Sequence, residues 1–176
     1  MRLELARRGG ETDMPMIDAP PQVPRHGVQP EAKNGGRGRL IGRTRGGLTS
    51  KLHAVTDALG RPIRMVLTRG QTSDYIGART LLSLLPAPKR LLADKGYDTN
   101  SLRSRLAETA TEAVIPPTRS RKAPIRYDTA ACRDRNKIER AFCRHKDWRR
   151  IATRYDTRAA DFASAVAIAA TIIRWT

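Results

Sequence analysis

The sequence predicts an α/β domain in which helices flank a mixed β-sheet. The predicted elements run strand, two paired strands, helix, strand, helix, strand and long helix, an alternation typical of a sheet layered between helices. The chain has 176 residues, which is room for one domain with a substantial core and hardly for two. We therefore expect a single layered domain.

The first predicted strand is short and ends on an acid. Met14-Pro15-Met16-Ile17 is an apolar run that stops at Asp18, so the strand would carry this carboxylate at its tip. Four prolines then fall between residues 20 and 30, a density that suits neither a strand nor a helix. Residues 33–47 are rich in Gly, Lys and Arg and indicate a flexible basic loop. We expect residues 20–47 to be irregular.

The middle of the chain predicts a hairpin and then alternating helices and strands. The β-rich segments 50–56 and 62–68 are joined by Asp57-Ala58-Leu59-Gly60-Arg61, which is a hairpin signal. A strand predicted at 89–93 runs into Asp94, and Gly96 lets the backbone turn sharply there. The other elements expected here are a helix at 75–85, a helix from about 100 to 107 capped by Asn100 or Thr99, a strand at 112–115, and a basic loop at 118–134.

A central helix is predicted over residues 135–146. Its buried edge would be formed by apolar residues at three- and four-residue steps, namely Ile138, Ala141 and Phe142, continued by Trp148. Arg135, Glu139 and Lys146 lie four and seven residues apart and would share a second stripe. A carboxylate between two cations suits a site for a metal ion and a phosphate, and an ordinary solvated helix face is the alternative.

The last predicted helix spans about residues 157–175. Its apolar run, residues 162–173, is twelve residues long, too short to span a bilayer, and indicates a buried helix. The two cysteines, Cys132 and Cys143, and the absence of a secretory signal favour a reducing cytoplasm without a disulfide framework. Cys143 and His145 lack a second ligand pair at a zinc-site spacing.

The net charge of +17, from 34 Lys and Arg against 17 Asp and Glu, predicts a polyanionic partner. Nucleic acid is the default, and its binding should weaken steeply with salt. A basic protein without a specific partner is the alternative. A membrane-surface role is disfavoured because no amphipathic segment carries the necessary large aromatic residues. We expect a cytoplasmic, nucleoid-associated protein.

Three acids stand at the ends of predicted elements. Asp18 closes the first strand, Asp94 follows the fourth, and Glu139 lies on the helix after the last. Mg²⁺ prefers hard oxygen ligands and keeps several waters, so two or three carboxylates suffice for a pair of ions. Such a pair would activate an attacking oxygen and stabilise a leaving one in phosphodiester displacement. The alternative for Asp18 and Asp94 is that they are solvated turn residues.

Several motifs resemble insertion-sequence transposases of the DDE class. Arg135, Glu139 and Lys146 match the signature Y-x2-R-x3-E-x6-K, and Ala93-Asp94-Lys95-Gly96-Tyr97-Asp98 resembles the second-acid motif. Met16-Ile17-Asp18-Ala19 is similar to the strand that carries the first acid. Residues 42–48 and 146–156 resemble the branch named after insertion sequence five. The resemblance covers about residues 14–176.

The resemblance implies a ribonuclease-H-like fold and divalent-metal catalysis, with two Mg²⁺ ions for which Mn²⁺ can substitute. It makes Asp18, Asp94 and Glu139 the catalytic and metal-binding triad. The implied partners are the terminal repeats of the element and target DNA, bound by a homo-oligomer. The cations expected near DNA are Arg43, Arg45, Lys95, Arg135, Lys146, Arg149 and Arg150.

The chain departs from the family pattern in three places. Cys132 stands where the signature has tyrosine. Residues 20–31 stand where the family segment is expected to contain a Thr, a Lys and an Ala-Ser-Ser-Leu-like stretch. Codons can be chosen for residues 20–31 such that reading them one base later gives a peptide that resembles this family segment. A compensated frameshift is our hypothesis, which the coding DNA decides. Residues 1–13 are interpreted as a remnant N-terminal segment before a catalytic domain at 14–176, so we expect a truncated transposase whose activity is in doubt.

Two other function classes remain open from the sequence. A nuclease of the same fold would cut DNA without joining it. A non-catalytic basic DNA-binding protein would bind without metal and would not respond to loss of the acids. A structural basic protein without a role on DNA would have no reason to carry three acid motifs in family order.

Overall fold

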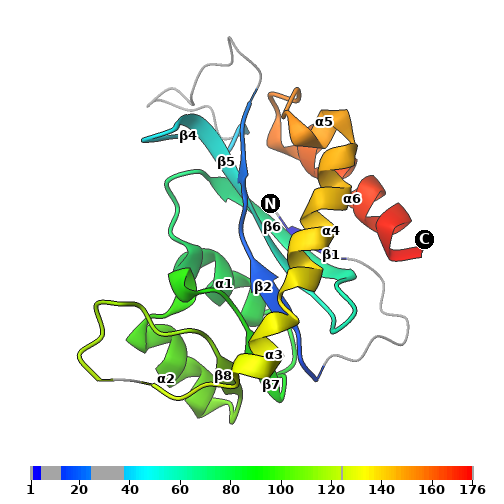
Figure 1. Cartoon of the computed structure of the whole chain (residues 1–176). Helices are drawn as coiled ribbons and strands as arrows, with labels where there is room; N and C mark the ends of the chain where they lie inside the picture. Colours follow the sequence, from blue (N-terminus) through cyan, green and yellow to red (C-terminus); the bar gives the residue numbers. More distant parts are fainter. Residues whose placement is uncertain (1, 5–12, 25–37, 124, 176) are drawn as a thin grey trace.

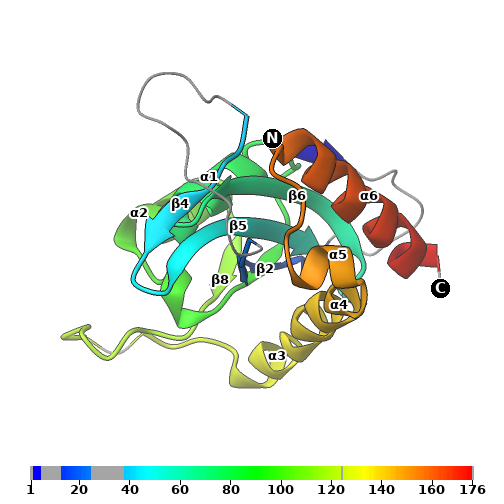
Figure 2. The ribbon, with the colours of Figure 1, turned by 90° about the horizontal axis from the view of Figure 1, so that it is seen from above.

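The computed structural model describes residues 2–4, 13–24, 38–123 and 125–175. One mixed sheet of eight strands forms its centre, with helices on both faces (Figures 1 and 2). The predicted class, a mixed sheet flanked by helices, is confirmed. In this part of the chain no helix is both long enough and apolar enough to cross a membrane.

The strands are short, apart from the two that form the central hairpin. They are β1 (Arg2–Glu4), β2 (Met16–Asp18), β3 (Pro21–Gln22), β4 (Gly42–Thr44), β5 (Gly47–Thr56), β6 (Pro62–Arg69), β7 (Arg90–Leu92) and β8 (Glu112–Val114). The helices are α1 (Asp74–Leu82), the 3₁₀ turn η1 (Lys95–Tyr97), α2 (Asn100–Glu108), α3 (Thr129–Arg133), α4 (Asn136–Asp147), α5 (Arg149–Ala152) and α6 (Ala159–Trp175).

The main line of the sheet is β1-β6-β5-β2-β7-β8. β5 and β6 form the predicted antiparallel hairpin, whose turn is closed by Asp57: its Oδ1 accepts from the backbone N–H of Leu59 at 3.0 Å and of Arg61 at 2.9 Å. β2 runs antiparallel to β5 but parallel to β7, and β7 runs parallel to β8. The carboxyl ends of β2, β7 and β8 therefore meet at one edge of the sheet.

The segment after β2 contradicts the expectation of an irregular stretch throughout residues 20–47. Pro21 and Gln22 form β3, which pairs with Lys51 and Ser50 in the same register that β2 uses on β5. Proline is tolerated because the strand is only two residues long and needs few backbone donors. Residues 42–44 form β4, which makes a tight hairpin with β5 through Gly47 at φ +98°. Residues 25–37 lie outside the described part of the chain.

Side-chain alternation along the strands divides the core into two layers. Met16 and Leu92 pack with α4 and α6 on one face, whereas Ile17 and Leu91 pack with α1 and α2 on the other. Figure 2 shows α4 and α6 on one side of the sheet and α1 and α2 on the other. The position of a polar residue at the end of a strand therefore determines which of the two layers its side chain faces.

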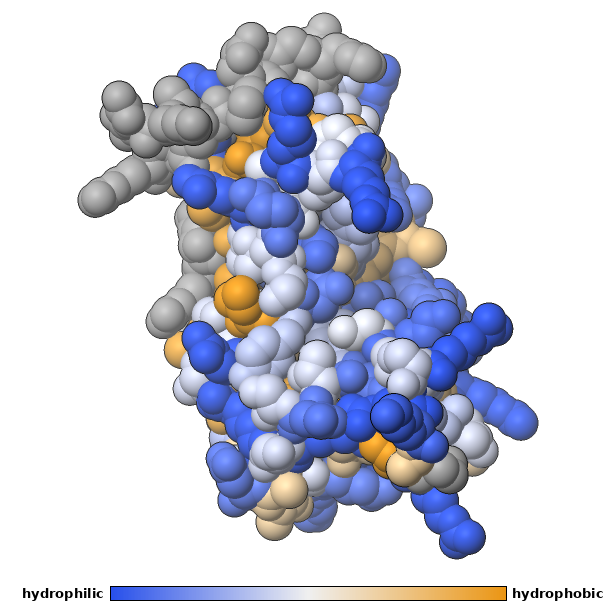
Figure 3. Space-filling model, turned by 90° about the vertical axis from the view of Figure 1, so that its left-hand side faces the viewer, coloured by the Kyte–Doolittle hydropathy of each residue, from blue (hydrophilic) through white to orange (hydrophobic). Residues whose placement is uncertain are grey.

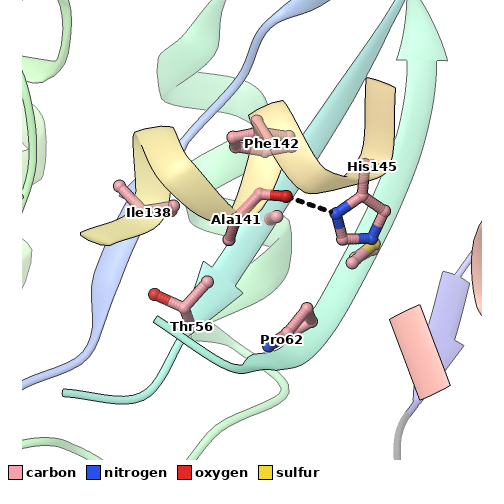
Figure 4. A pocket seen from close by; sticks show the side chains of 8 residues that line it. Thr56, Pro62, Ile138, Ala141, Phe142 and His145 are labelled. Carbon is pink, nitrogen blue, oxygen red and sulfur yellow. Dashed lines mark hydrogen bonds between the residues drawn. The ribbon is translucent and has the colours of Figure 1, made fainter. Parts of the chain in front are cut away.

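The central helix forms as predicted, but its buried edge differs at one end. Ile138, Ala141 and Phe142 are buried, whereas Trp148 is 39 % exposed. The helix ends at Asp147, so the spacing to Trp148 no longer holds, and His145 fills the last buried position. Figure 4 shows His145 above an apolar gap beneath α4, where its Nδ1 donates to the Ala141 carbonyl oxygen at 2.8 Å.

Two short helices were not predicted. α3 lies within the expected basic loop 118–134 and is capped by Asp128, whose Oδ1 accepts from the Ala131 N–H at 2.8 Å. α5 follows Trp148 directly. Helices of one turn are too short to show a hydrophobic period, which is why the pattern missed them.

Two buried histidines make stability depend on pH. His53 is fully buried on β5, and burial lowers its pKa to about 4; burial also lowers the pKa of His145. In the unfolded chain both titrate near 6.5, so the unfolded state binds more protons as the pH falls below that value, and stability falls with pH. We expect the free energy of unfolding to drop by about 2–3 kcal/mol between pH 7.5 and 4.5 from His53 alone.

Urea unfolding at the two pH values measures this dependence. His53→Gln should flatten it, because glutamine can still reach Thr68 Oγ1, the partner of His53 Nε2 at 2.8 Å, but does not titrate. Equal pH dependence in the variant would show that His53 is not the responsible group.

Candidate active site

Asp18 and Asp94 lie next to each other at the carboxyl ends of two neighbouring parallel strands. β2 and β7 are paired with Met16 opposite Leu92, and Asp18 and Asp94 each stand two residues further along the chain, where the charge of Asp94 acts on Asp18. Alternation also puts both carboxylates on the α4 side, since Met16 and Leu92 belong to that layer. Two acids with 75 residues between them in the sequence thus face the same helix.

Each aspartate is oriented by one backbone hydrogen bond. Asp18 Oδ1 accepts from the Ala19 N–H at 2.8 Å, and Asp94 Oδ1 accepts from the Gly96 N–H at 2.9 Å, which caps η1. A Cβ at Gly96 would lie 3.0 Å from Asp94 Oδ1, so glycine permits this close turn. Within the described residues, Oδ2 of both acids makes no hydrogen bond and is available to a cation.

The charges of both other acids affect the pKa of Asp18. Its pKa is raised, chiefly by burial and further by the negative charges of Asp94 and Glu139, while the Ala19 hydrogen bond and Arg135 oppose the rise. The charges of Asp94 and Glu139 therefore both reach Asp18. A bound cation would relieve this repulsion.

Glu139 and Arg135 form an ion pair across the first turn of α4. Arg135 Nη2 lies 2.6 Å from Glu139 Oε1, and the glutamate side chain is 51 % exposed. In the described ranges, no group of three or more His, Cys, Asp or Glu side chains is close enough to hold one metal ion. The structure thus brings Asp18 and Asp94 together, and Glu139 lies nearby in an ion pair with Arg135.

Tyr97 is a site residue to which the sequence analysis assigned no role. It is 1 % exposed, and its hydroxyl has no hydrogen-bond partner among the described residues. Its pKa is strongly raised, mainly by burial and then by the charges of Asp74, Asp18 and Asp94. The signal in the sequence was its place in the motif Ala93-Asp94-Lys95-Gly96-Tyr97-Asp98, three residues after Asp94.

The predicted DNA-binding cations are mostly exposed but lie in different surroundings. Arg43 and Arg45 stand on the β4–β5 hairpin, Lys95 directly follows Asp94, and Lys146 and Arg149 lie at the α4–α5 junction. Arg135 is engaged by Glu139, as described above. Arg150 makes two hydrogen bonds to the Asp156 carboxylate, at 2.9 and 2.5 Å, which were not foreseen. Figure 3 shows one face of the molecule, covered largely by hydrophilic side chains.

Comparisons with known proteins identify the family. The model of the transposase DDE domain family matches residues 17–174. A Brucella ovis protein named for the transposase of insertion sequence element IS6501 is 36 % identical over 129 residues, covering 72 % of this chain and 98 % of that protein. A Burkholderia cepacia protein named for the transposase of IS402 is 27 % identical over 137 residues, covering 72 % of this chain and 63 % of that protein.

One solved structure shows the same fold. A chain of the simian T-cell lymphotropic virus intasome, solved with the PP2A regulatory subunit B56 gamma, aligns with a TM-score of 0.50 over 93 % of this chain and 50 % of its own length, at 12 % identity. This chain thus spans half of that structure's length and 63 % of the second relative's length. Its sheet order and flanking helices are those of a ribonuclease-H-like fold. The protein belongs to the DDE-domain transposases of insertion sequences.

Proposed function

We propose that this chain cleaves phosphodiesters at the ends of an insertion sequence and transfers the freed strand to target DNA, using Asp18, Asp94 and Glu139. The observation that carries the proposal is the side-by-side position of Asp18 and Asp94 at the carboxyl ends of β2 and β7, facing the helix that holds Glu139. Family membership supports DNA as the substrate, and the net charge of +17 supports binding to its backbone.

The donor set fits a divalent cation. The three acids supply only hard oxygen ligands, which Mg²⁺ and Mn²⁺ prefer, and each aspartate has a free Oδ2 within the described residues. Glu139 would have to exchange Arg135 for the cation, which costs little because an exposed ion pair is worth about 0–1 kcal/mol. When bound, a pair of ions would lower the pKa of the attacking water and stabilise the leaving oxygen.

The chain's own residues would position the DNA. Release from Glu139 frees Arg135 to bind a phosphate oxygen, and the exposed Lys95 lies one residue from Asp94. Water attacks phosphorus and the bond to the 3′-oxygen breaks, so the cut strand has a 3′-hydroxyl on one side of the break and a 5′-phosphate on the other side. The 3′-hydroxyl then attacks a target phosphodiester and displaces a new 3′-oxygen. No covalent bond between protein and DNA forms in either step.

Glu139→Gln is expected to abolish Mn²⁺-dependent nicking of supercoiled DNA while DNA affinity survives. Glutamine preserves the size of the side chain but removes a negative ligand from the site. Asp147→Asn is the matched control, because it removes one exposed negative charge from the same helix, away from Asp18. Equal nicking by Glu139→Gln and wild type would rule out the proposed triad.

A non-catalytic DNA-binding protein is the second candidate. It is favoured by the ion pair that occupies Glu139 and by the departure from the family segment directly after Asp18. Such a protein would bind DNA in a metal-independent, salt-sensitive way, and all the acid variants would bind as wild type does. A nuclease of the same fold would nick DNA but would give no product in a strand-transfer assay.

We further propose that active protein works as a homo-oligomer on DNA.

A further inference from the structure

A basic arm leaves the body of the protein between β8 and α3. We define it as residues 116–123 and 125–127, and Figure 2 shows this segment extending away from the rest of the chain. The side chains of Arg119, Lys122 and Arg126 are exposed, and in the described part of the chain none of them pairs with an acid. Hydrogen bonds from the Arg121 N–H to the Thr118 carbonyl, at 3.1 Å, and between Thr118 Oγ1 and Ser120 Oγ, at 3.2 Å, shape its first turn.

The outgoing end of the arm is fastened to Asp98. This carboxylate is fully buried: Oδ1 accepts from Arg103 Nε at 2.7 Å, and Oδ2 accepts from the Thr118 N–H at 2.7 Å and from Arg121 Nε at 2.6 Å. Burial alone would raise the pKa of Asp98, but the bonds from Arg121, Thr118 and Arg103 bring it well below its usual range. Charge-assisted bonds of this kind are about twice as strong as neutral ones.

The returning end is fastened to Arg90. Its Nη2 donates to Asp128 Oδ2 at 2.6 Å, and its Nε donates to Glu112 Oε2 at 2.9 Å. Arg90 begins β7 and Asp98 follows η1, so the two anchors lie four residues before and four residues after Asp94. Both ends of the arm are thus attached to the segment that presents this acid.

We propose that the basic arm binds the DNA backbone beside Asp94, and that Asp98 is a positioning residue that holds the arm in place for this contact. The proposal rests on the proposed function for the identity of the polyanion. A loop that is already fixed at both ends loses less conformational entropy on binding than a free loop. Asp98 neutralises Arg121, so the cations left for phosphate are the three exposed ones, which would supply position rather than sequence readout.

Salt titration of DNA binding tests the arm. The arm variant Arg119→Gln/Lys122→Gln/Arg126→Gln should lower the slope of log affinity against log salt by roughly 2–3, since each lost phosphate contact removes about 0.9. The control variant Arg79→Gln/Lys89→Gln/Arg158→Gln removes the same charge from exposed positions on α1, before β7 and before α6. The probe is a labelled duplex of arbitrary sequence bound to the full chain. Equal slopes for the two variants would overturn the proposal.

Asp98→Asn tests the anchor, because it removes no cation and keeps the size of the side chain. We expect roughly three- to tenfold weaker DNA binding and faster tryptic cleavage within the arm, as the bonds to Arg121 and Thr118 weaken from charge-assisted to neutral. In the arm-variant background the same substitution should cost no further affinity. An equal loss in both backgrounds would mean that Asp98 acts through the fold and not through the arm.

The two proposals fail in different ways. If the catalytic proposal is wrong, Glu139→Gln nicks normally while the arm variant still shows the reduced salt slope. If the arm proposal is wrong, the arm variant binds DNA like its control while Glu139→Gln still loses nicking.

Discussion

Asp94→Asn is expected to reduce Mn²⁺-dependent nicking on the order of a thousandfold or more and to remove the stabilisation that Mn²⁺ gives the folded protein. Asparagine Oδ1 can still accept from the Gly96 N–H, so η1 should keep its cap and the fold should persist. The charge beside Asp18 is what disappears. One partly buried aspartate with a raised pKa is a much poorer ligand for a divalent ion than two adjacent ones.

Thermal unfolding with and without MnCl₂ separates this effect from catalysis. A ligand at one hundred times its dissociation constant stabilises the native state by about 2.7 kcal/mol, so a wild-type shift should be readily measurable. Asp13→Asn is the control, because Asp13 is an exposed acid near the opposite end of β7 and its carboxylate pairs only with Lys89 among the described residues. If Mn²⁺ stabilises Asp94→Asn as much as it stabilises the wild type, the metal does not bind at Asp94.

Strands β2, β5, β6, β7 and β8 and the main helices could be predicted because their signals are local, whereas β1, β3 and β4 were not predicted. β7 is followed within two residues by Asp94 and a glycine turn, and the hairpin of β5 and β6 shows its turn residues. The pairing of Asp18 with Asp94 had no such signal, since the register between β2 and β7 depends on tertiary packing. These acids were nominated by their places at the ends of predicted elements and by resemblance to a family, and the pairing of β2 with β7 explains why the two belong together.

Ion pairs show the same division between local and distant signals. The Arg135–Glu139 pair follows from an i,i+4 spacing on a helix and was implicit in the predicted stripe. Arg150 was expected near DNA, yet its guanidinium binds Asp156 across the turn after α5. The anchors of the basic arm, Asp98 with Arg121 and Arg90 with Asp128, join segments more than twenty residues apart, where sequence spacing carries no information.

Arg154→Met is expected to lower the free energy of unfolding by about 3–5 kcal/mol. Arg154 is fully buried, and burial lowers its pKa to about 10, so it remains charged at neutral pH. Its guanidinium lies 5.1 Å from the centre of the Phe162 ring. It donates hydrogen bonds to four oxygens, namely Ser50 Oγ and the carbonyls of Arg39, Asp156 and Thr157. Methionine fills similar space but leaves these acceptors unsatisfied.

Arg154→Lys separates the charge from the geometry. An ammonium group keeps the positive charge but has three donors and no planar fork, so we expect an intermediate loss of about 1–3 kcal/mol. Urea unfolding measures both variants, with Arg79→Met as the control because Arg79 is exposed on α1 and should change stability by less than about 0.5 kcal/mol. If Arg154→Met does not fold, Arg154→Lys is still informative. Wild-type stability of the lysine variant would show that the planar guanidinium geometry of Arg154 is not required.

Arg154 also influences the position of Asp18 in the candidate site, because it contacts the segment that follows Asp18. Its backbone N–H donates to the Val23 carbonyl at 3.0 Å, and Pro24 forms a bridge with it, so the line of β2 and β3 along β5 is fixed at its far end by Arg154. A looser segment would let Asp18 shift, and a displacement of about 1 Å can cost on the order of a hundredfold in rate. We therefore expect Arg154→Lys to lose nicking at temperatures well below its unfolding transition, whereas Arg79→Met should not.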